Sequence, residues 1–483
     1  MSGDEISFWD SSDTPSYDDW LRSAESVVGA ENVESILHTT LPNGIRTQPI
    51  YTGEMVGDIS DLPSVGLNLR SSNPAGNVNG WDIRQRHWVT DTEKTNKAIL
   101  NDLSRGTRSI ELVLENSEFG SYEELLSGVL LNIAGIGLSS SCGSVSNASH
   151  LFDYMRTGLP NSEQNICDLG VDPVGELLIG SSDFSRFESD SQFALELSSK
   201  VSTEFSNMTT FRIDGLKFAQ VGADPITEIA GILSALVSYL RLMDEAGVKT
   251  DVALSQCLIV VSVGTDQFFD IAKLRALRLL IANIGRECGV QDTQLRTQAQ
   301  TPDFLISQDD PWVNLLRTTV SCFAAATGGS DIITLPTFDS AFGIPDEFGQ
   351  RLARNTHLVL MEESNIHRVI DPAGGSWYVE TITKEITDNA WQKFQEIEAN
   401  GGFIEQVASG QFKEQAKQSR QDFKKKVLSN EMTFIGVNAF RETQGTDLAR
   451  DPYPIHSNDR YTEELDFRIS DIKGDNEEKN ADS

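Results

Sequence analysis

Residues 256–300 read QCLIVVSVGTDQFFDIAKLRALRLLIANIGRECGVQDTQLRTQAQ, and this stretch decides the fold class. The run QCLIVVSVG (256–264) is short, apolar and rich in valine and isoleucine, which is typical of a buried strand. In DIAKLRALRLLIANIGRECG (270–289) apolar residues recur at helical spacing and a glycine follows the last turn, which predicts a helix. TQLRTQAQ (293–300) predicts a second strand, so the stretch reads as a β-α-β unit.

The same alternation repeats along most of the chain. We predict six further strands, SIELVLE (109–115), GIGLSSSC (135–142), NICDLGV (165–171), MTTFRIDG (208–215), SDIITLPT (330–337) and THLVLMEES (356–364). Eight strands alternating with helices over roughly 270 residues predict an α/β fold, a (β/α)8 TIM barrel. A doubly wound sheet is the alternative, but its usual nucleotide signals, GxGxxG and GxxxxGK[ST], do not occur.

The rest of the chain divides around this barrel. Residues 1–92 hold one amphipathic helical piece, YDDWLRSAESVV, an extended stretch, LPNGIRTQPIYTGE, and many turn residues, so we predict an N-terminal arm that contacts another subunit. We assign residues 93–400 to the barrel, 401–470 to a C-terminal helical extension and 471–483 to a disordered acidic tail.

Several predicted strands carry small polar residues where a packed barrel usually has bulky branched ones. They are Ser139, Ser141, Thr209, Thr297, Gln298 and Gln300. Either these side chains line a polar bore through the barrel, or they face the helices or gather at the strand ends.

Composition narrows the class of protein. The formal net charge of −33 disfavours binding to nucleic acid or to an anionic membrane surface, and it fits solubility or a salty habitat. No run of apolar residues is long enough for a membrane span, and the acidic start lacks the features of a signal peptide, so we expect a cytoplasmic protein. The 5 cysteines are scattered without a CxxC pair, and the 6 histidines without HxxxH, so we expect free thiols and no metal site.

A set of ordered segments resembles the methylmalonyl-CoA mutase family. The segments are LPNGIRTQPIYT (41–52), GWDIRQRHW (80–88), FFDIAKLRALRLL (268–280), LRTQAQT (295–301), RLARNTHLVLMEESNIHRVIDPAGGSWYVE (351–380) and FIGVN (434–438). The resemblance implies a TIM barrel whose axis is lined by small polar side chains and threaded by the pantetheine arm of coenzyme A. It also implies a radical rearrangement of an acyl-CoA that depends on adenosylcobalamin, a cofactor that supplies chemistry no side chain can perform.

The chain departs from the family pattern at the positions that the resemblance marks as functional. Gly215-Leu216-Lys217 stands where active chains have Gly-Tyr-His, and Gln298-Ala299-Gln300 stands where they have His-Ser-Gln. SSNPAGNVNG (71–80) lacks the tyrosine that faces cobalamin, and residues 165–190 offer no counterpart of the arginine that clamps the substrate carboxylate. The chain ends about 45 residues after FIGVN without Asp-x-His-x-x-Gly, the motif that supplies the lower cobalt ligand; its last histidine is His456.

These departures imply a degenerate site at Leu216, Lys217 and Gln298, with Arg84, Thr297 and Gln300 as the candidates for a residual CoA channel. We expect a non-catalytic small subunit in a heterodimer, whose catalytic large subunit binds the adenosylcobalamin and the acyl-CoA. The alternative is a catalytic barrel of the isobutyryl-CoA mutase type that works with a separate small cobalamin-binding chain. A third reading makes Lys217 a Schiff-base lysine at the end of a barrel strand.

Overall fold

The computed structural model of the chain describes residues 16–41, 44–55, 70, 79–114, 120–139, 144–158, 167–180, 182–291, 293, 295–442, 448–453 and 467–472. Its centre is a closed barrel of parallel strands in the order β10-β3-β4-β5-β6-β7-β8-β9. The strands are β3 (Asp82–Trp88), β4 (Ser109–Val113), β5 (Gly135–Leu138), β6 (Cys167–Val171), β7 (Met208–Asp214), β8 (Cys257–Ser262), β9 (Arg296–Gln300) and β10 (Ile332–Thr334). The predicted (β/α)8 fold is therefore confirmed.

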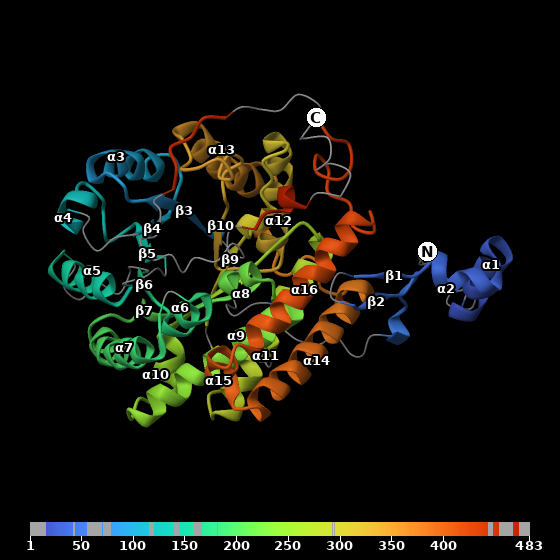
Figure 1. The fold of residues 1–483 in the computed structure, drawn as a ribbon, viewed down its shortest axis with the longest axis horizontal. Helices are drawn as coiled ribbons and strands as arrows, with labels where there is room; N and C mark the ends of the chain where they lie inside the picture. The colour runs from blue at the N-terminus through green and yellow to red at the C-terminus, as the bar shows by residue number, and fades with distance from the viewer. Residues whose placement is uncertain are drawn as a thin grey trace, which may run out of the picture.

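Helices cover the outside of this barrel (Figure 1). The larger ones that follow successive strands are α3 (Thr92–Leu103), α5 (Ser144–Gly158), α7 (Phe184–Glu204), α9 (Pro225–Glu245), α11 (Gln267–Glu287), α12 (Pro311–Thr327) and α13 (Glu347–Leu358). Shorter helices lie between them: α4 (Tyr122–Leu125), α6 (Pro173–Ile179), α8 (Gly215–Val221) and α10 (Thr250–Ser255). Helix α11 begins where Asp266 accepts a hydrogen bond from the Phe269 amide, and its predicted apolar stripe is buried.

One predicted strand is wrong, and another strand takes its place. Residues 356–364 continue helix α13 into a π-helical turn, Val359–Glu363, because no helix breaker interrupts the chain before Asn365, which adopts a left-handed φ of 55°. The missing barrel strand is β3, inside GWDIRQRHW, a segment that we had placed in the arm. Its arginines are the reason that no strand was predicted here, since charged side chains are rare inside a barrel.

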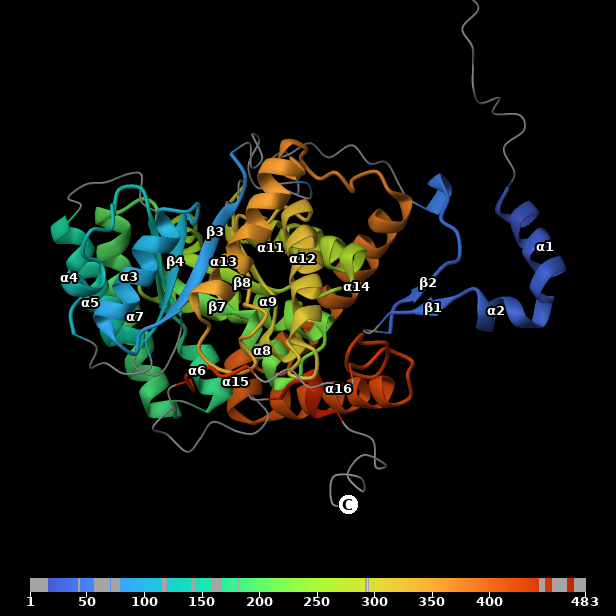
Figure 2. The ribbon, with the colours of Figure 1, turned by 90° about the horizontal axis from the view of Figure 1, so that it is seen from above.

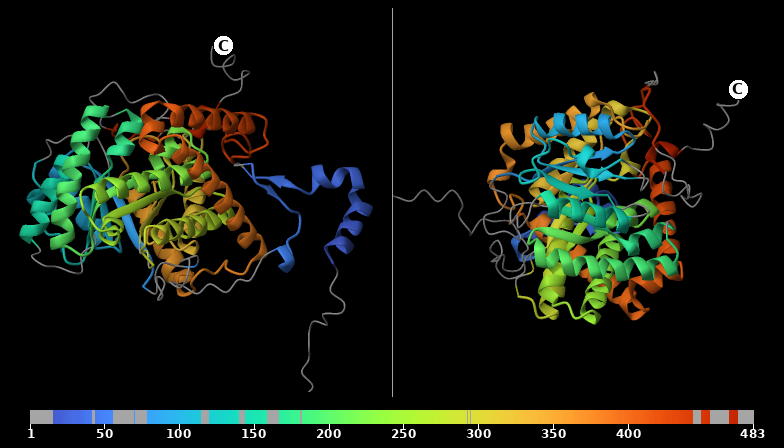
Figure 3. Two further views of the ribbon diagram at one scale, coloured as in Figure 1. Left: turned by 90° about the horizontal axis from the view of Figure 1, so that it is seen from below. Right: turned by 90° about the vertical axis from the view of Figure 1, so that its left-hand side faces the viewer.

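Before β3 the chain leaves the barrel. Helix α1 (Tyr17–Val28), α2 (Val33–Ile36) and the hairpin of β1 (Thr39–Thr40) with β2 (Arg46–Thr47) extend away from the body of the molecule, as Figures 1–3 show. Helix α1 buries none of its residues in this chain, and Val27 is 82% exposed. The arm is fixed near its end, where Tyr51 meets Tyr378 with ring centroids 5.1 Å apart.

Three helices follow the barrel: α14 (Trp377–Ala399), α15 (Gly402–Ala408) and α16 (Gln411–Leu428). Helix α14 packs on α9 and α11, and α16 crosses near α8 (Figures 1 and 2). Among the described helices, α9 alone is long and apolar enough to cross a membrane, yet 78% of its apolar window is buried inside the molecule, as expected of a core helix.

Candidate functional site

The candidate site is formed by the side chains that face the axis of the barrel. Side chains alternate between the two faces of a strand, and residues that are partners in parallel register share a face. Arg84 on β3 pairs in register with Ser109 on β4, and Gln298 on β9 with Val260 on β8. Contacts of Arg84 with β6 and β9, which are not its neighbours in the barrel, show that this set faces the axis.

The lower part of the axis is occupied by Arg84. Its Nη1 lies 2.6 Å from Oδ2 of Asp168 and donates to Oε1 of Gln298 at 3.1 Å, while its Nε donates to Ser109. Both charged side chains are buried, and Thr209 also donates to Asp168 at 2.7 Å. These contacts join β3 to β6 and β9 across the interior.

Glu111 occupies the level above. It accepts hydrogen bonds from Nη1 of Arg212 at 3.2 Å and from Nε2 of Gln298 at 2.7 Å, and Nε of Arg86 lies 3.2 Å from its other oxygen. Burial alone would raise the pKa of Glu111, but Arg212, Arg86 and Arg84 outweigh it and hold the pKa at about 2. Glu111 is therefore ionised at neutral pH.

We call Arg84, Glu111, Asp168, Arg212 and Gln298 the interior network. All five are at most 1% exposed. The polar barrel interior anticipated from the sequence is present, but long charged side chains fill it where short ones would leave a bore. The sequence signal for these charged residues is a charge at an alternate position of a strand, as in SIELV, CDLGV and FRID. Our sequence analysis did not use this signal.

Gly137 on β5 makes room for the network. A Cβ atom at this glycine would lie 2.9 Å from Nη1 of Arg84, closer than such contacts occur. The absence of a side chain here thus allows the Arg84 guanidinium to reach the centre of the barrel.

Aromatic and aliphatic side chains line part of the mouth of the barrel, at the carboxyl ends of the strands. Arg86 lies over the ring of Trp88, and the Trp88 ring packs 5.0 Å from that of Tyr453 near the C-terminus. Leu216 packs against Leu258 and Val260, which are inward residues of β8. Active sites of TIM barrels lie at this end, and these side chains occupy part of it here.

The other residues singled out from the sequence do not converge on one point. Lys217, just after β7, lies 3.1 Å from Asp172, which also accepts from Tyr239 at 2.9 Å and from the Gly175 amide. Thr297 points away from the axis and donates to Asp331. Gln300 shares the inward face of Gln298, and its Oε1 is buried without a hydrogen bond.

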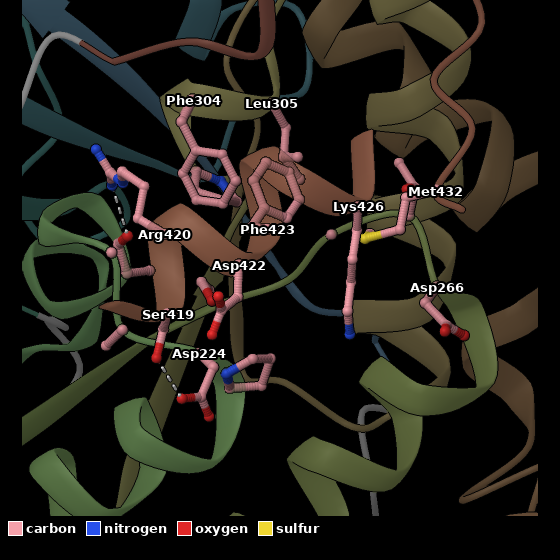
Figure 4. A pocket seen from close by; sticks show the side chains of 18 of the residues that line it. Asp224, Asp266, Phe304, Leu305, Ser419, Arg420, Asp422, Phe423, Lys426 and Met432 are labelled. Atoms are coloured by element: carbon pink, nitrogen blue, oxygen red, sulfur yellow. Dashed lines mark hydrogen bonds between the residues drawn. The ribbon is translucent and has the colours of Figure 1, made fainter. Parts of the chain in front are cut away.

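A pocket of about 540 Å³ lies beside the axis, between α16 and the loops after β8 and β9 (Figure 4). Phe304 and Phe423 form its apolar wall, and Ser419 on α16 donates to Asp224 across it. Burial raises the pKa of Asp270, on its lining, to about 7 despite the nearby Lys273. Lys273 itself is held by Glu228 at 2.6 Å.

A histidine binds a metal through an accessible neutral nitrogen. Of the described histidines, His87 and His357 are buried, whereas His38, His150 and His367 are at least partly exposed. Burial lowers the pKa of His357 to about 3, and its Nδ1 accepts a hydrogen bond from Trp81. In the described part of the chain, no three histidine, cysteine or acidic side chains gather as a metal site.

Comparison with known proteins gives the family. The methylmalonyl-CoA mutase family model matches residues 170–482. The small subunit of methylmalonyl-CoA mutase from Streptomyces virginiae is 33% identical over 91% of this chain and 72% of its own length. That from Propionibacterium freudenreichii subsp. shermanii is 31% identical over 86% of this chain and 65% of its own length. The large subunit from Streptomyces virginiae is 26% identical over 88% of this chain and 62% of its own length. On the family model and these identities, the chain belongs to the methylmalonyl-CoA mutase family.

Proposed function

We propose that this chain is the small subunit of an adenosylcobalamin-dependent methylmalonyl-CoA mutase and that its own barrel performs no catalysis. The observation that carries this proposal is the interior network. An acyl-CoA that threads the barrel would need the space that Arg84 and Arg212 occupy, and it would have to break ion pairs at 2.6 and 3.2 Å. Removing one partner of such a buried pair is strongly unfavourable.

The positions of the candidate residues support the same proposal. Arg84 is a candidate contact for a CoA phosphate, but it is fully buried, and Asp168, Gln298 and Ser109 already contact its Nη1 and Nε atoms. Lys217 is held by an ion pair with Asp172 at 3.1 Å, so its amine is engaged and not presented to a carbonyl substrate.

We propose that the reaction belongs to a catalytic large subunit, which binds adenosylcobalamin and interconverts (R)-methylmalonyl-CoA and succinyl-CoA. Adenosylcobalamin supplies the radical chemistry when bound. The present chain would contribute a matched surface and its projecting arm. None of the apolar residues of α1 is fully buried within the described chain, as expected if a second protein covers them.

The test is to express this chain alone and together with the large mutase subunit from the same genome. Each sample is sized, titrated with adenosylcobalamin and assayed for methylmalonyl-CoA turnover. We expect the chain alone to be inert and to bind no cobalamin, and the pair to copurify one-to-one and to be active.

The alternative reading is tested in the same experiment by adding a small cobalamin-binding chain. If that mixture turns over isobutyryl-CoA or another acyl-CoA without the large subunit, the chain is itself catalytic. The proposal would then be wrong, and the interior network would have to open during turnover.

A further inference from the structure

Helix α12 has an unusual composition for an outer helix of an acidic protein. Its sequence, PWVNLLRTTVSCFAAAT, contains one charged residue, Arg317, in a chain whose net charge is −33. The Arg317 side chain is buried, and its Nη2 donates to the carbonyl of Ile435. The outward positions are apolar instead: Leu316 is 65% exposed, and Trp312 lies one turn before it on the same side.

This apolar surface extends beyond α12. The Trp312 ring stacks on Phe338 with centroids 4.8 Å apart, and Phe338 in turn contacts the half-exposed Phe348 on α13. On the other side, the loop that contains Ile435 is fixed to α12 by Arg317, and Phe440 at its end is 84% exposed. We call Trp312, Leu316, Phe348, Ile435 and Phe440 the α12 face.

Such a face is unusual in a protein that has no partner. Scattered apolar side chains are normal on a surface, but a connected patch of large ones marks an interaction site. Interface cores are depleted in charge and enriched in tryptophan and phenylalanine, and the α12 face shares both features. Helix α12 itself carries no carboxylate, which reduces the repulsion that a second acidic protein would meet there.

We propose that the α12 face is a second contact surface for the catalytic large subunit, in addition to the arm; this rests on the function proposed above. Helix α12 lies on the half of the barrel nearer the arm, whereas α4 and α5 lie on the far half (Figures 1 and 2). A protein held by the arm is therefore within reach of α12. Two separate contact regions also fix the orientation of the partner, which one projecting arm alone does not do.

The test uses the full chain with the purified large subunit. The variant Leu316→Lys places a charge in the middle of the face, and its long exposed stem is tolerated on a helix surface. Ile133→Lys is the matched control, because Ile133 is 74% exposed between α4 and β5, away from the face. We expect the dissociation constant to rise at least tenfold for the first variant and to change less than twofold for the control.

A photo-crosslinking residue at position 316 identifies the occupant directly, with the large subunit, a second copy of this chain and the small cobalamin-binding chain each offered in turn. We expect an adduct with the large subunit alone. An adduct only with another protein would overturn the choice of partner. Normal affinity of Leu316→Lys together with no adduct would refute the face as an interface, although arm-dependent binding would still support the subunit function. No binding by the unaltered chain would refute that function itself.

Discussion

Replacing Arg84 with methionine should destabilise the barrel more than any surface change. The substitution keeps most of the side-chain volume but leaves Asp168 buried without its partner at 2.6 Å, and it leaves Oε1 of Gln298 without its donor. Breaking a buried ion pair from one side typically costs 3–5 kcal/mol, so we expect a loss of about 4 kcal/mol in the free energy of unfolding. The short distance to Asp168 and the full burial of both side chains place Arg84 well within that range.

The double variant, Arg84→Met with Asp168→Asn, tests whether the two residues act as a pair. Asp168→Asn alone should cost about 3 kcal/mol, because Arg84 then keeps only Asp82 at 3.8 Å and its hydrogen bonds. If the two residues were independent, the double variant would lose about 7 kcal/mol. We expect about 4 kcal/mol, since removing both charges leaves neither side of the Arg84–Asp168 pair as a lone buried ion and preserves the Thr209 hydrogen bond through asparagine.

Urea unfolding of the full chain, followed by circular dichroism, measures all three variants. Lys97→Met is the control, because its pair with Glu93 is exposed on α3 and its loss should leave the free energy of unfolding almost unchanged. A loss below about 1 kcal/mol for Arg84→Met, or additive losses in the double variant, would refute the claim that the interior network is a coupled, closed structure.

Other predictions follow from single contacts. Gly137→Ala should cost about 1–3 kcal/mol, because its Cβ would press on Arg84, and the cost should fall below about 1 kcal/mol when Arg84 is also methionine; urea unfolding measures both. Lys217→Met should cost about 2 kcal/mol by removing a partner of Asp172, and it should leave turnover of the assembled mutase unchanged. Burial lowers the pKa of His357 to about 3 from 6.5, so below pH 6.5 the unfolded chain takes up a proton that the folded chain does not. The free energy of unfolding should therefore fall by about 1.4 kcal/mol for each pH unit from 6.5 toward 3. The variant His357→Gln should remove this part of the slope. The slope is measured between pH 6.5 and 4.5, because Glu111 keeps its stabilising charge in that range.

The sequence predicts the barrel well because most of its strands and helices have a recognisable local pattern of apolar residues. The periodicity of residues 270–289 matches α11, and apolar runs such as 256–264 match strands. The failures are at β3 and at residues 356–364. Strand β3 reads DIRQRHW, and nothing local distinguishes an arginine that finds a carboxylate across a barrel from one that faces water. Residues 356–364 were misread because an apolar run fits a strand and a helix equally well.

For the candidate site, the sequence predicts less than it does for the fold. Alternation along a strand tells which residues share a face, so it could place Gln298 and Gln300 together and Thr297 opposite them. It does not tell which residues meet across the axis. Arg84 and Asp168 come from β3 and β6, and their contact depends on the register of the strands between them. The ion pair of Lys217 with Asp172 is likewise a product of the fold.

The difference between an open and a closed barrel lies in side-chain length as well as polarity. Serine and threonine facing inward would leave a polar bore, whereas an arginine that reaches the axis from one strand meets an acid from a distant strand. The inward arginines are Arg84, Arg86, Arg212 and Arg296, and each lies within 3.3 Å of Asp168, Glu111 or Asp214. An anionic CoA ester would therefore find every inward arginine already neutralised, in a chain whose net charge is −33. Because an open and a charge-filled barrel are both polar inside, composition alone does not tell them apart, and side-chain length and the contacts across the axis do.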